Sequence, residues 1–306
     1  MPAVEVNHIK KSFGSVKAVD DVSFSVERGE IFGLLGPNGA GKTTTIRLML
    51  DIFKPESGQV SILGGPMDEN KKNRIGYMPE ERGLYQDISL ERCLVYLGSL
   101  KGLAPEEARQ RASEYLKRFD LADYQNKPIK ELSKGMQQKA QIIATLLHNP
   151  ELVIIDEPFS GLDPVNTNMV KSLLRDLHAE GVTIIMSTHQ MHQVEELCER
   201  ILLIHRGRAV LYGDLDDIRR QFSGRAVLVR AAQELGENDW RRLLPDLDQV
   251  EANNSASKLT LGENSSPQEV LARLVQQNVA LERFEIATPT LDEIFIRVVQ
   301  SEGEPA

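Results

Sequence analysis

One nine-residue segment constrains the fold of this chain more than any other part of it. Residues 36–44 read G-P-N-G-A-G-K-T-T and fit the pattern G-x-x-x-x-G-K-[S/T], in which a glycine-rich turn wraps backbone N–H groups around a phosphate. Residues 31–35 before it are almost all apolar, which is typical of a strand buried on both faces of a parallel sheet. Residues 45–50 continue as a helix, whose N-terminus attracts anions. The segment therefore predicts a nucleotide-binding loop between a buried strand and a helix.

The chemistry of this loop gives two side chains a specific role. Lys42 can reach the β- and γ-phosphates of a nucleoside triphosphate, and Thr43 can offer its hydroxyl to Mg²⁺. An accidental match is the alternative, and the flanking strand and helix argue against it. The predicted nucleotide-binding residues of the loop are Gly36, Pro37, Asn38, Gly39, Ala40, Gly41, Lys42, Thr43 and Thr44.

The composition narrows the partners and the location. The 306 residues suggest about two domains, and the net charge of −9 argues against nucleic acid as a partner, because binding a phosphate backbone needs a basic surface. Residues 223–306 hold 14 acidic and 8 basic side chains, so this part contributes −6 of the total charge. The chain has neither the pattern of a signal peptide nor an apolar run of about 20 residues. We therefore expect a cytosolic protein whose two cysteines, Cys93 and Cys198, are reduced.

Alternating strand and helix patterns predict an α/β core. Short apolar runs at residues 152–156 and 182–186 fit buried strands, and residues 164–179 between them fit a helix, which implies right-handed parallel crossovers. Residues 87–148 have helical spacing of their apolar side chains and are expected to form an all-helical insertion. Further strands are expected at residues 4–9 and 22–26.

After Gly224 the pattern changes to that of a small α+β unit. Strands are expected at residues 225–230, 257–261 and 281–286, and helices at residues 267–276 and 290–299. The sequence of this unit contains no metal-ligand cluster, no glycine-rich loop and no pair of nucleophile and base. We therefore expect a ferredoxin-like arrangement that serves packing or dimerisation.

Polar residues follow two of the predicted buried strands. Asp156 ends the first of them and is placed to hold Mg²⁺, and Glu157 is placed to act as the general base for an attacking water. His189 follows the next strand and can hydrogen-bond a γ-phosphate. Two ordinary surface acids and a structural histidine are the alternatives, which the phosphate-binding loop upstream disfavours.

A second phosphate site is expected where the helix after Leu132 begins. Ser133 is a good N-cap, and Gly135 costs helix stability, which indicates a close approach of the backbone to a ligand. A simply capped helix is the alternative.

These motifs together resemble those of ABC transporter ATP-binding subunits. Residues 132–137, L-S-K-G-M-Q, are similar to the family signature L-S-G-G-Q, from which Lys134 and Met136 depart. Residues 152–157 resemble the Walker B strand and residues 160–163 the D-loop, while His189 takes the place of the switch histidine. The resemblance covers about residues 3–220 and includes five motifs in the family order.

The resemblance implies a fold and further site residues. It implies a P-loop NTPase (RecA-like) core with a β-subdomain and a helical insertion in residues 1–220, followed by the α+β domain in residues 224–306. It adds Gln137 and Asp163 as contacts to the nucleotide. It also makes Phe13 the ring that stacks on adenine, although a core aromatic beside a turn is the alternative.

One residue departs from the family pattern inside the expected site. After the strand at residues 75–79 the family has a glutamine that contacts Mg²⁺ and senses the membrane partner, whereas this chain has Glu80. A carboxylate can also bind Mg²⁺ or its water, but it adds negative charge beside Asp156 and Glu157. Residues 79–85 and 289–295 resemble the ATPases of ABC-2-type exporters, including NatA-like and drug-export ATPases.

The resemblance finally implies a function. Two copies would enclose two ATP molecules with Mg²⁺, the loop of one copy facing Ser133 and Gly135 of the other, and hydrolysis would power a separate membrane permease. The protein would then lie at the inner face of the membrane through that partner. Two rivals stay open: an ABC ATPase acting on ribosomes or DNA, which the acidic charge and single ATPase unit disfavour, and a regulatory module without hydrolysis, which Glu80 keeps possible.

Overall fold

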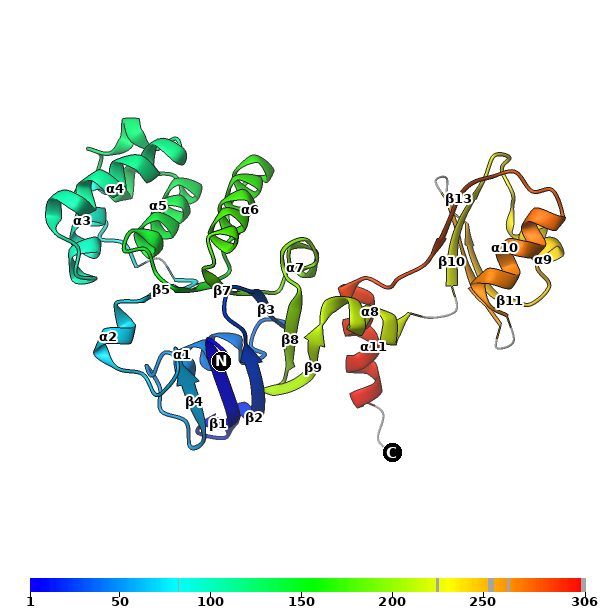
Figure 1. The fold of residues 1–306 in the computed structure, drawn as a ribbon, viewed down its shortest axis with the longest axis horizontal. Helices are drawn as coiled ribbons and strands as arrows, with labels where there is room; N and C mark the ends of the chain where they lie inside the picture. The colour runs from blue at the N-terminus through cyan, green and yellow to red at the C-terminus, as the bar shows by residue number, and fades with distance from the viewer. Residues whose placement is uncertain (82, 224–225, 253–255, 263–264, 304–306) are drawn as a thin grey trace. The chain divides into compact units, whose positions relative to one another are not determined.

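The computed structural model describes residues 1–81, 83–223, 226–252, 256–262 and 265–303 of the chain. These residues form two compact units, Met1–Leu215 and Asp216–Ala306, each with a hydrophobic core of its own (Figure 1).

A six-stranded sheet forms the centre of the first unit. Its strand order is β5-β6-β7-β3-β8-β9, with parallel pairing from β5 to β8 and an antiparallel hairpin of β8 and β9. Every residue of β3, β6 and β7 is buried, as their continuous apolar runs predict. The strands are β3 (Ile31–Leu35), β5 (Ile75–Met78), β6 (Leu152–Asp156), β7 (Thr183–Thr188), β8 (Arg200–His205) and β9 (Arg208–Asp214).

This strand order positions the site. Because β6, β7 and β3 are parallel neighbours, their carboxyl ends meet at one edge of the sheet. The segments after these strands lead into α6 (Pro164–Ala179), α7 (Met191–Leu197) and α1 (Lys42–Met49). The phosphate-binding loop, the two acidic residues and the histidine expected from the sequence lie in these three connections or at the ends of the elements that flank them.

A second, three-stranded sheet has the order β2-β1-β4 and is antiparallel. Its strands are β1 (Val4–Phe13), β2 (Val16–Val26) and β4 (Ser57–Ile62). The strands expected at residues 4–9 and 22–26 are therefore shorter than the observed β1 and β2. The exposed polar residues near the turn of this hairpin obscure the alternation of polar and apolar residues that indicates a strand. The buried side chains of Ile9 and Phe24 join one core with those of Phe32 and Ile154 from the central sheet.

Three helices form the insertion expected at residues 87–148, and they lie together at one end of the first unit (Figure 1). They are α3 (Leu90–Leu100), α4 (Pro105–Arg118) and α5 (Lys134–Leu146). Pro105 occupies the first turn of α4, where a missing N–H costs nothing. Ser133 caps α5, since its side chain accepts a hydrogen bond of 3.2 Å from the N–H of Met136. Short connecting elements are α2 (Glu69–Lys72) and two 3₁₀ turns, Ala122–Tyr124 and Ile129–Glu131.

The second unit contains the ferredoxin-like order of elements, β-α-β-β-α-β. Its antiparallel sheet has the order β11-β12-β10-β13, and α9 and α10 cover one face of it (Figure 1). The elements are β10 (Ala226–Ala231), α9 (Glu237–Leu243), β11 (Leu247–Ala252), β12 (Ser257–Leu261), α10 (Pro267–Gln276) and β13 (Leu281–Ile286), flanked by α8 (Leu215–Phe222) and α11 (Leu291–Gly303).

Sequence reasoning missed α9 and β11 in this unit. Both are short, and their many charged residues conceal the few apolar ones. Trp240 anchors α9, because its ring is 1% exposed and its indole Nε1 donates a 2.9 Å hydrogen bond to Ser257 Oγ on β12. The expected starts of the unit at 224 and of its first strand at 225 lie outside the described residues.

Candidate functional site

A cavity of about 660 Å³ opens at the carboxyl edge of the central sheet. The phosphate-binding loop, the acidic pair, Glu80 and the β8–β9 turn all contribute to its wall. The lining residues are Val16, Lys17, Ala18, Asn38, Gly39, Ala40, Gly41, Lys42, Thr43, Thr44, Glu80, Asp156, Glu157 and Arg206.

The glycines of the loop are required by its backbone. Gly36 and Gly41 have φ angles of 148° and 112°, in the region that side chains disfavour. A Cβ atom on Gly36 would lie 2.2 Å from the carbonyl oxygen of Ile204, and one on Gly41 would lie 2.4 Å from that of Ala18. The loop can therefore pack this tightly only with glycine at both positions.

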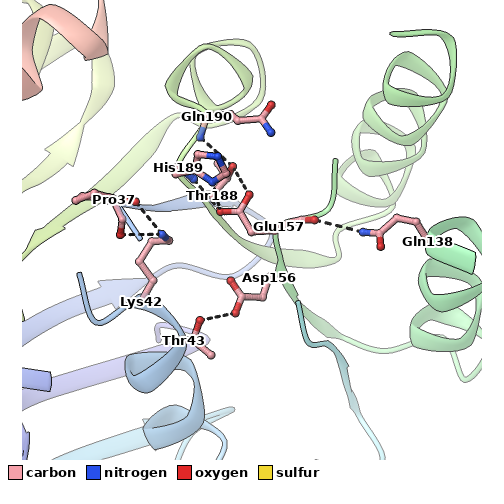
Figure 2. Close-up of polar contacts among 10 residues, drawn as sticks. Pro37, Lys42, Thr43, Gln138, Asp156, Glu157, Thr188, His189 and Gln190 are labelled. Carbon is pink, nitrogen blue, oxygen red and sulfur yellow. Dashed lines mark hydrogen bonds and ion pairs between the residues drawn. The ribbon is translucent and has the colours of Figure 1, made fainter. Parts of the chain in front are cut away.

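Lys42 is held inside the loop. Its side chain is buried, and its Nζ donates hydrogen bonds to the carbonyl oxygens of Gly36 at 2.7 Å and Pro37 at 3.3 Å (Figure 2). Burial lowers the pKa of this ammonium, while the negative charges of Glu157, Asp156 and Glu80 act in the opposite direction. The three carboxylates thus favour the charged form that a phosphate would pair with.

Thr43 and Asp156 meet at the floor of the cavity. The Thr43 hydroxyl donates a 2.8 Å hydrogen bond to Oδ2 of Asp156, while Oδ1 is buried and has no hydrogen-bond partner among the residues that the structure describes (Figure 2). An orphaned carboxylate oxygen beside a threonine hydroxyl fits a hard divalent cation. Among the described residues, no group of three or more His, Cys, Asp or Glu side chains could hold a metal ion. A Mg²⁺ here would therefore depend on phosphate and water for the rest of its ligands.

Glu157 is the most constrained residue of the site. Its φ angle of 54° is unusual for a side chain of this size, and such strain persists only where the surroundings impose it. Its Oε2 accepts from the Thr188 hydroxyl at 3.0 Å, and its Oε1 accepts from the backbone N–H of His189 at 3.0 Å and from the ring Nδ1 at 2.6 Å (Figure 2). The Nε2 amide of Gln138 donates to the Glu157 carbonyl at 3.3 Å. Backbone and carboxylate are thus both held in place.

The predicted second phosphate site lies apart from this cavity. Ser133, Gly135, Gln137 and Asp163 are absent from the cavity lining. A Cβ atom on Gly135 would lie 3.4 Å from the carbonyl oxygen of Gly161, so the start of α5 packs against the segment that precedes α6. Asp163 caps α6 by accepting a 2.9 Å hydrogen bond from the N–H of Asn166.

Comparison with known proteins identifies the family. Residues 19–160 match the family model described as ABC transporter. The uncharacterized ABC transporter ATP-binding protein YhaQ of Bacillus subtilis (strain 168) is 41% identical over 296 residues, which cover 96% of this chain and 97% of that protein. The chain belongs to the ABC transporter ATP-binding proteins. The resemblance predicted from the sequence motifs is therefore confirmed.

Further comparisons support both parts of this ABC protein. Residues 213–299 match the family model described as ATP-binding protein DrrA1-3-like, C-terminal domain. The daunorubicin resistance ATP-binding protein DrrA3 of Streptomyces coeruleorubidus is 31% identical over 315 residues, covering 97% of this chain and 95% of that protein. A solved structure described as the ATP binding subunit of an ABC transporter is 36% identical, with a TM-score of 0.67, and covers 72% of this chain and 93% of its own. The predicted P-loop NTPase fold and C-terminal α+β domain are confirmed.

Membership of the ABC transporter family indicates the activity of this chain. ABC ATP-binding proteins bind and hydrolyse ATP and work with separate transmembrane permease components, so this chain is an ATPase coupled to transmembrane transport. None of the helices in the described part of the chain is both long and apolar enough to span a bilayer.

Phe13 lies outside the cavity lining. It is 47% exposed at the end of β1, and its ring meets that of Phe53 edge-on at 5.5 Å between centroids. It is therefore not the core aromatic that the sequence offers as an alternative. Stacking on adenine stays a prediction. Val16, three residues later, does line the cavity.

Several residues of the site escaped the sequence analysis. Gln138 and Thr188 are adjacent in sequence to predicted site residues, and both donate hydrogen bonds to Glu157. Neither residue belongs to a motif that would have indicated this role. Lys17 and Arg206 reach the cavity from a β-strand and a hairpin turn with no motif of their own. Gly207, between the apolar runs at residues 201–204 and 209–212, is the signal that could have indicated a turn here.

Proposed function

We propose that this chain is the ATPase subunit of an exporter and works as a nucleotide-dependent homodimer. The observation that supports the proposal is that Ser133, the N-cap of α5, and Gly135 in its first turn are absent from the lining of the cavity that contains the phosphate-binding loop. Ser133, Gly135, Gln137 and Asp163 would then complete the cavity of a second copy. Two ATP molecules would be bound between the two copies.

Hydrolysis in this proposal depends on Glu157. Its carboxylate would accept a proton from the attacking water, and Thr188 and His189 would orient it. Because Oε1 can only accept, Nδ1 of His189 carries a proton in this contact. For His189 to donate to the γ-phosphate as well, its Nε2 would also have to carry a proton. Lys42 would move from the loop carbonyls to the phosphates.

Thr43, Asp156 and Glu80 would hold Mg²⁺, and Phe13 would stack on adenine. When bound, Mg²⁺ neutralises the charge that develops on the transferred phosphoryl group. Glu80 stands where the family has glutamine, and its carboxylate would bind the cation or its water.

The permease would dock beside the helical insertion. An apolar groove of about 360 Å³ lies there, lined in part by Tyr77, Leu84, Leu97, Leu100 and His148. Next to it, Gln141 of α5 donates hydrogen bonds to the carbonyls of Pro79 at 2.8 Å and Glu81 at 3.2 Å, the two neighbours of Glu80. A permease segment in this groove would be coupled to the ATP cavity through Glu80.

The similarity to DrrA3 supports export as the direction of transport, and the transported substrate would be selected by the permease. The protein would then lie at the inner face of the cell membrane through that partner. We also propose that the C-terminal α+β unit promotes dimerisation.

The dimer is tested with the Glu157→Gln variant. We expect this variant to shift from monomer to dimer on addition of ATP and Mg²⁺, measured by size-exclusion chromatography with light scattering. The Lys42→Ala variant is the control and should remain monomeric because it lacks the phosphate ligand. A Glu157→Gln protein that stays monomeric at high concentration with ATP bound would contradict the proposal.

A further inference from the structure

The turn between β8 and β9 carries an unusual residue. Arg206 and Gly207 form a two-residue hairpin loop in which both φ angles are positive, 48° and 79°. Such turns favour Asn-Gly or Asp-Gly, because asparagine, aspartate and glycine adopt the left-handed conformation at the lowest cost. Arginine at the first position gives up stability that asparagine would retain. A strained residue held in place by its surroundings is a reason to ask about function.

The turn is fixed to two walls of the ATP cavity. The N–H of Gly207 donates a 2.8 Å hydrogen bond to the carbonyl of Ala40 in the phosphate loop, and the Gly207 carbonyl accepts one of 2.7 Å from the N–H of Asp20 on β2. The Arg208 guanidinium donates to Asp20 Oδ2 at 2.8 Å. A Cβ atom on Gly207 would lie 3.0 Å from the carbonyl oxygen of Ala18. Arg206 therefore projects from a rigid support.

Arg206 contributes a positive charge to the cavity. It lines the cavity with Lys17 and Ala18 on the β2 side, and within the described part of the chain no ion-pair or side-chain hydrogen-bond partner is found for it. Lys17 and Lys42 are the other two basic side chains of the lining, and Lys42 is the one that interacts with the carboxylates of Glu157, Asp156 and Glu80. A guanidinium binds phosphate oxygens in a planar, bidentate manner.

The location selects one part of the nucleotide. The β- and γ-phosphates belong with Lys42, Thr43 and Asp156, so the β2 side receives the ribose and the α-phosphate. We propose that Arg206 is a further nucleotide-binding residue, whose guanidinium contacts the α-phosphate and ribose end of ATP. This inference rests on the proposed use of the cavity as the ATP site.

The test compares Arg206→Asn with Arg206→Lys in the full chain. Asparagine suits the turn but removes the charge, whereas lysine keeps the charge. We expect Arg206→Asn to weaken binding of both ATP and ADP by about five- to tenfold in isothermal titration calorimetry, and Arg206→Lys to lose less. Without nucleotide, the thermal unfolding midpoint of Arg206→Asn should equal or exceed that of the wild type, which a merely structural arginine would not produce.

Four outcomes separate the possible failures. Unchanged affinity of Arg206→Asn for both nucleotides, with binding abolished in the Lys42→Ala control, would overturn the inference. Weakened binding of ATP but not of ADP would overturn it too, because the contact would then be with the γ-phosphate. A change mainly in the ratio of ATP to GTP affinity would instead indicate a contact with the base. Wild-type affinity in Lys42→Ala would mean that the cavity is not the ATP site, so that the proposed function fails first.

Discussion

At the scale of single residues, the proposed chemistry of the site depends on the hydrogen-bond partners of the charged groups of Lys42 and Glu157. The ammonium of Lys42 donates a hydrogen bond to a loop carbonyl, and the carboxylate of Glu157 accepts hydrogen bonds from Thr188 and His189. Both charged groups therefore have hydrogen-bond partners in this structure. Both would change partners when phosphate and water arrive. The two residues should therefore fail in different ways when they are replaced.

The Lys42→Ala and Glu157→Gln variants separate binding from hydrolysis. Lys42→Ala should lose ATP affinity because the loop loses its cation, whereas Glu157→Gln should retain ATP but lose the proton acceptor. We expect hydrolysis by Glu157→Gln to fall by roughly 100-fold or more. A steady-state phosphate-release assay together with equilibrium binding of ATP measures both effects. Turnover at wild-type rates in both variants would contradict the assignment.

His148 gives the first unit a pH-dependent stability. Burial, together with the charges of Lys101 and Arg111, lowers the pKa of this histidine from 6.5 to about 4, although its Nε2 donates to the Ile75 carbonyl at 3.1 Å. The unfolded chain binds a proton below about pH 6.5 and the folded chain does not, so folding loses stability as the pH falls toward 4. By this linkage, the loss at pH 5 is about 2 kcal/mol.

Urea unfolding at pH 7 and pH 5 checks this value. The wild type should lose about 2 kcal/mol more than His148→Gln over this interval, because glutamine keeps an N–H donor but does not titrate. An equal loss in both proteins, or a His148 ring signal that titrates near pH 6.5 by NMR, would refute the prediction.

At the scale of elements, the α5 helix stabilises the turn that precedes it, besides the predicted contact with nucleotide. The amide of Gln137 is buried, and its Nε2 donates to the carbonyls of Ile129 at 3.0 Å and Leu132 at 3.1 Å. These bonds hold the 3₁₀ turn against the start of the helix. The position of Ser133 and Gly135 therefore depends on Gln137.

Replacing Gln137 by alanine should destabilise the first unit. The Leu132 carbonyl would lose the Gln137 donor, and the Ile129 carbonyl would keep only the N–H of Leu132 at 3.0 Å, which costs about 1–3 kcal/mol in total. The matched variant Ser133→Ala removes only the N-cap and should cost about 1 kcal/mol. Urea denaturation without nucleotide compares the two. If Gln137→Ala is as stable as the wild type, the amide contributes nothing to this helix and is available for a ligand.

At the scale of the whole molecule, each of the two units has a hydrophobic core among its described residues. The first core joins the two sheets of residues Met1–Leu215, and the second lies under α9 and α10. All residues that line the proposed ATP cavity belong to the first unit. ATP is therefore expected to stabilise only one of the two units.

Differential scanning calorimetry of the Glu157→Gln variant tests this expectation. We expect two unfolding transitions, of which only one shifts upward with ATP and Mg²⁺. At 100 times the dissociation constant the stabilisation is about 2.7 kcal/mol, which corresponds to roughly 5–11 °C for a unit of this size. A single transition that shifts as a whole would mean that the two units unfold together.

Much of the fold was predictable because its signals are local. The buried strands at residues 152–156 and 31–35 and the glycine loop are encoded in continuous segments, and the structure contains each of them. The second unit was predicted less completely. Its short α9 and β11 depend on Trp240 packing against β12, a contact between residues distant in the sequence.

The sequence by itself determined the phosphate loop, the acidic pair and the family, because each is a pattern of neighbouring residues. Tertiary structure decided which distant residues meet. The strand order β6-β7-β3 brings His189 to Glu157, and the β8–β9 hairpin brings Arg206 to the cavity while Phe13 lies outside its lining. These outcomes depend on crossovers and hairpin packing between segments far apart in the chain, for which no single segment carries a signal.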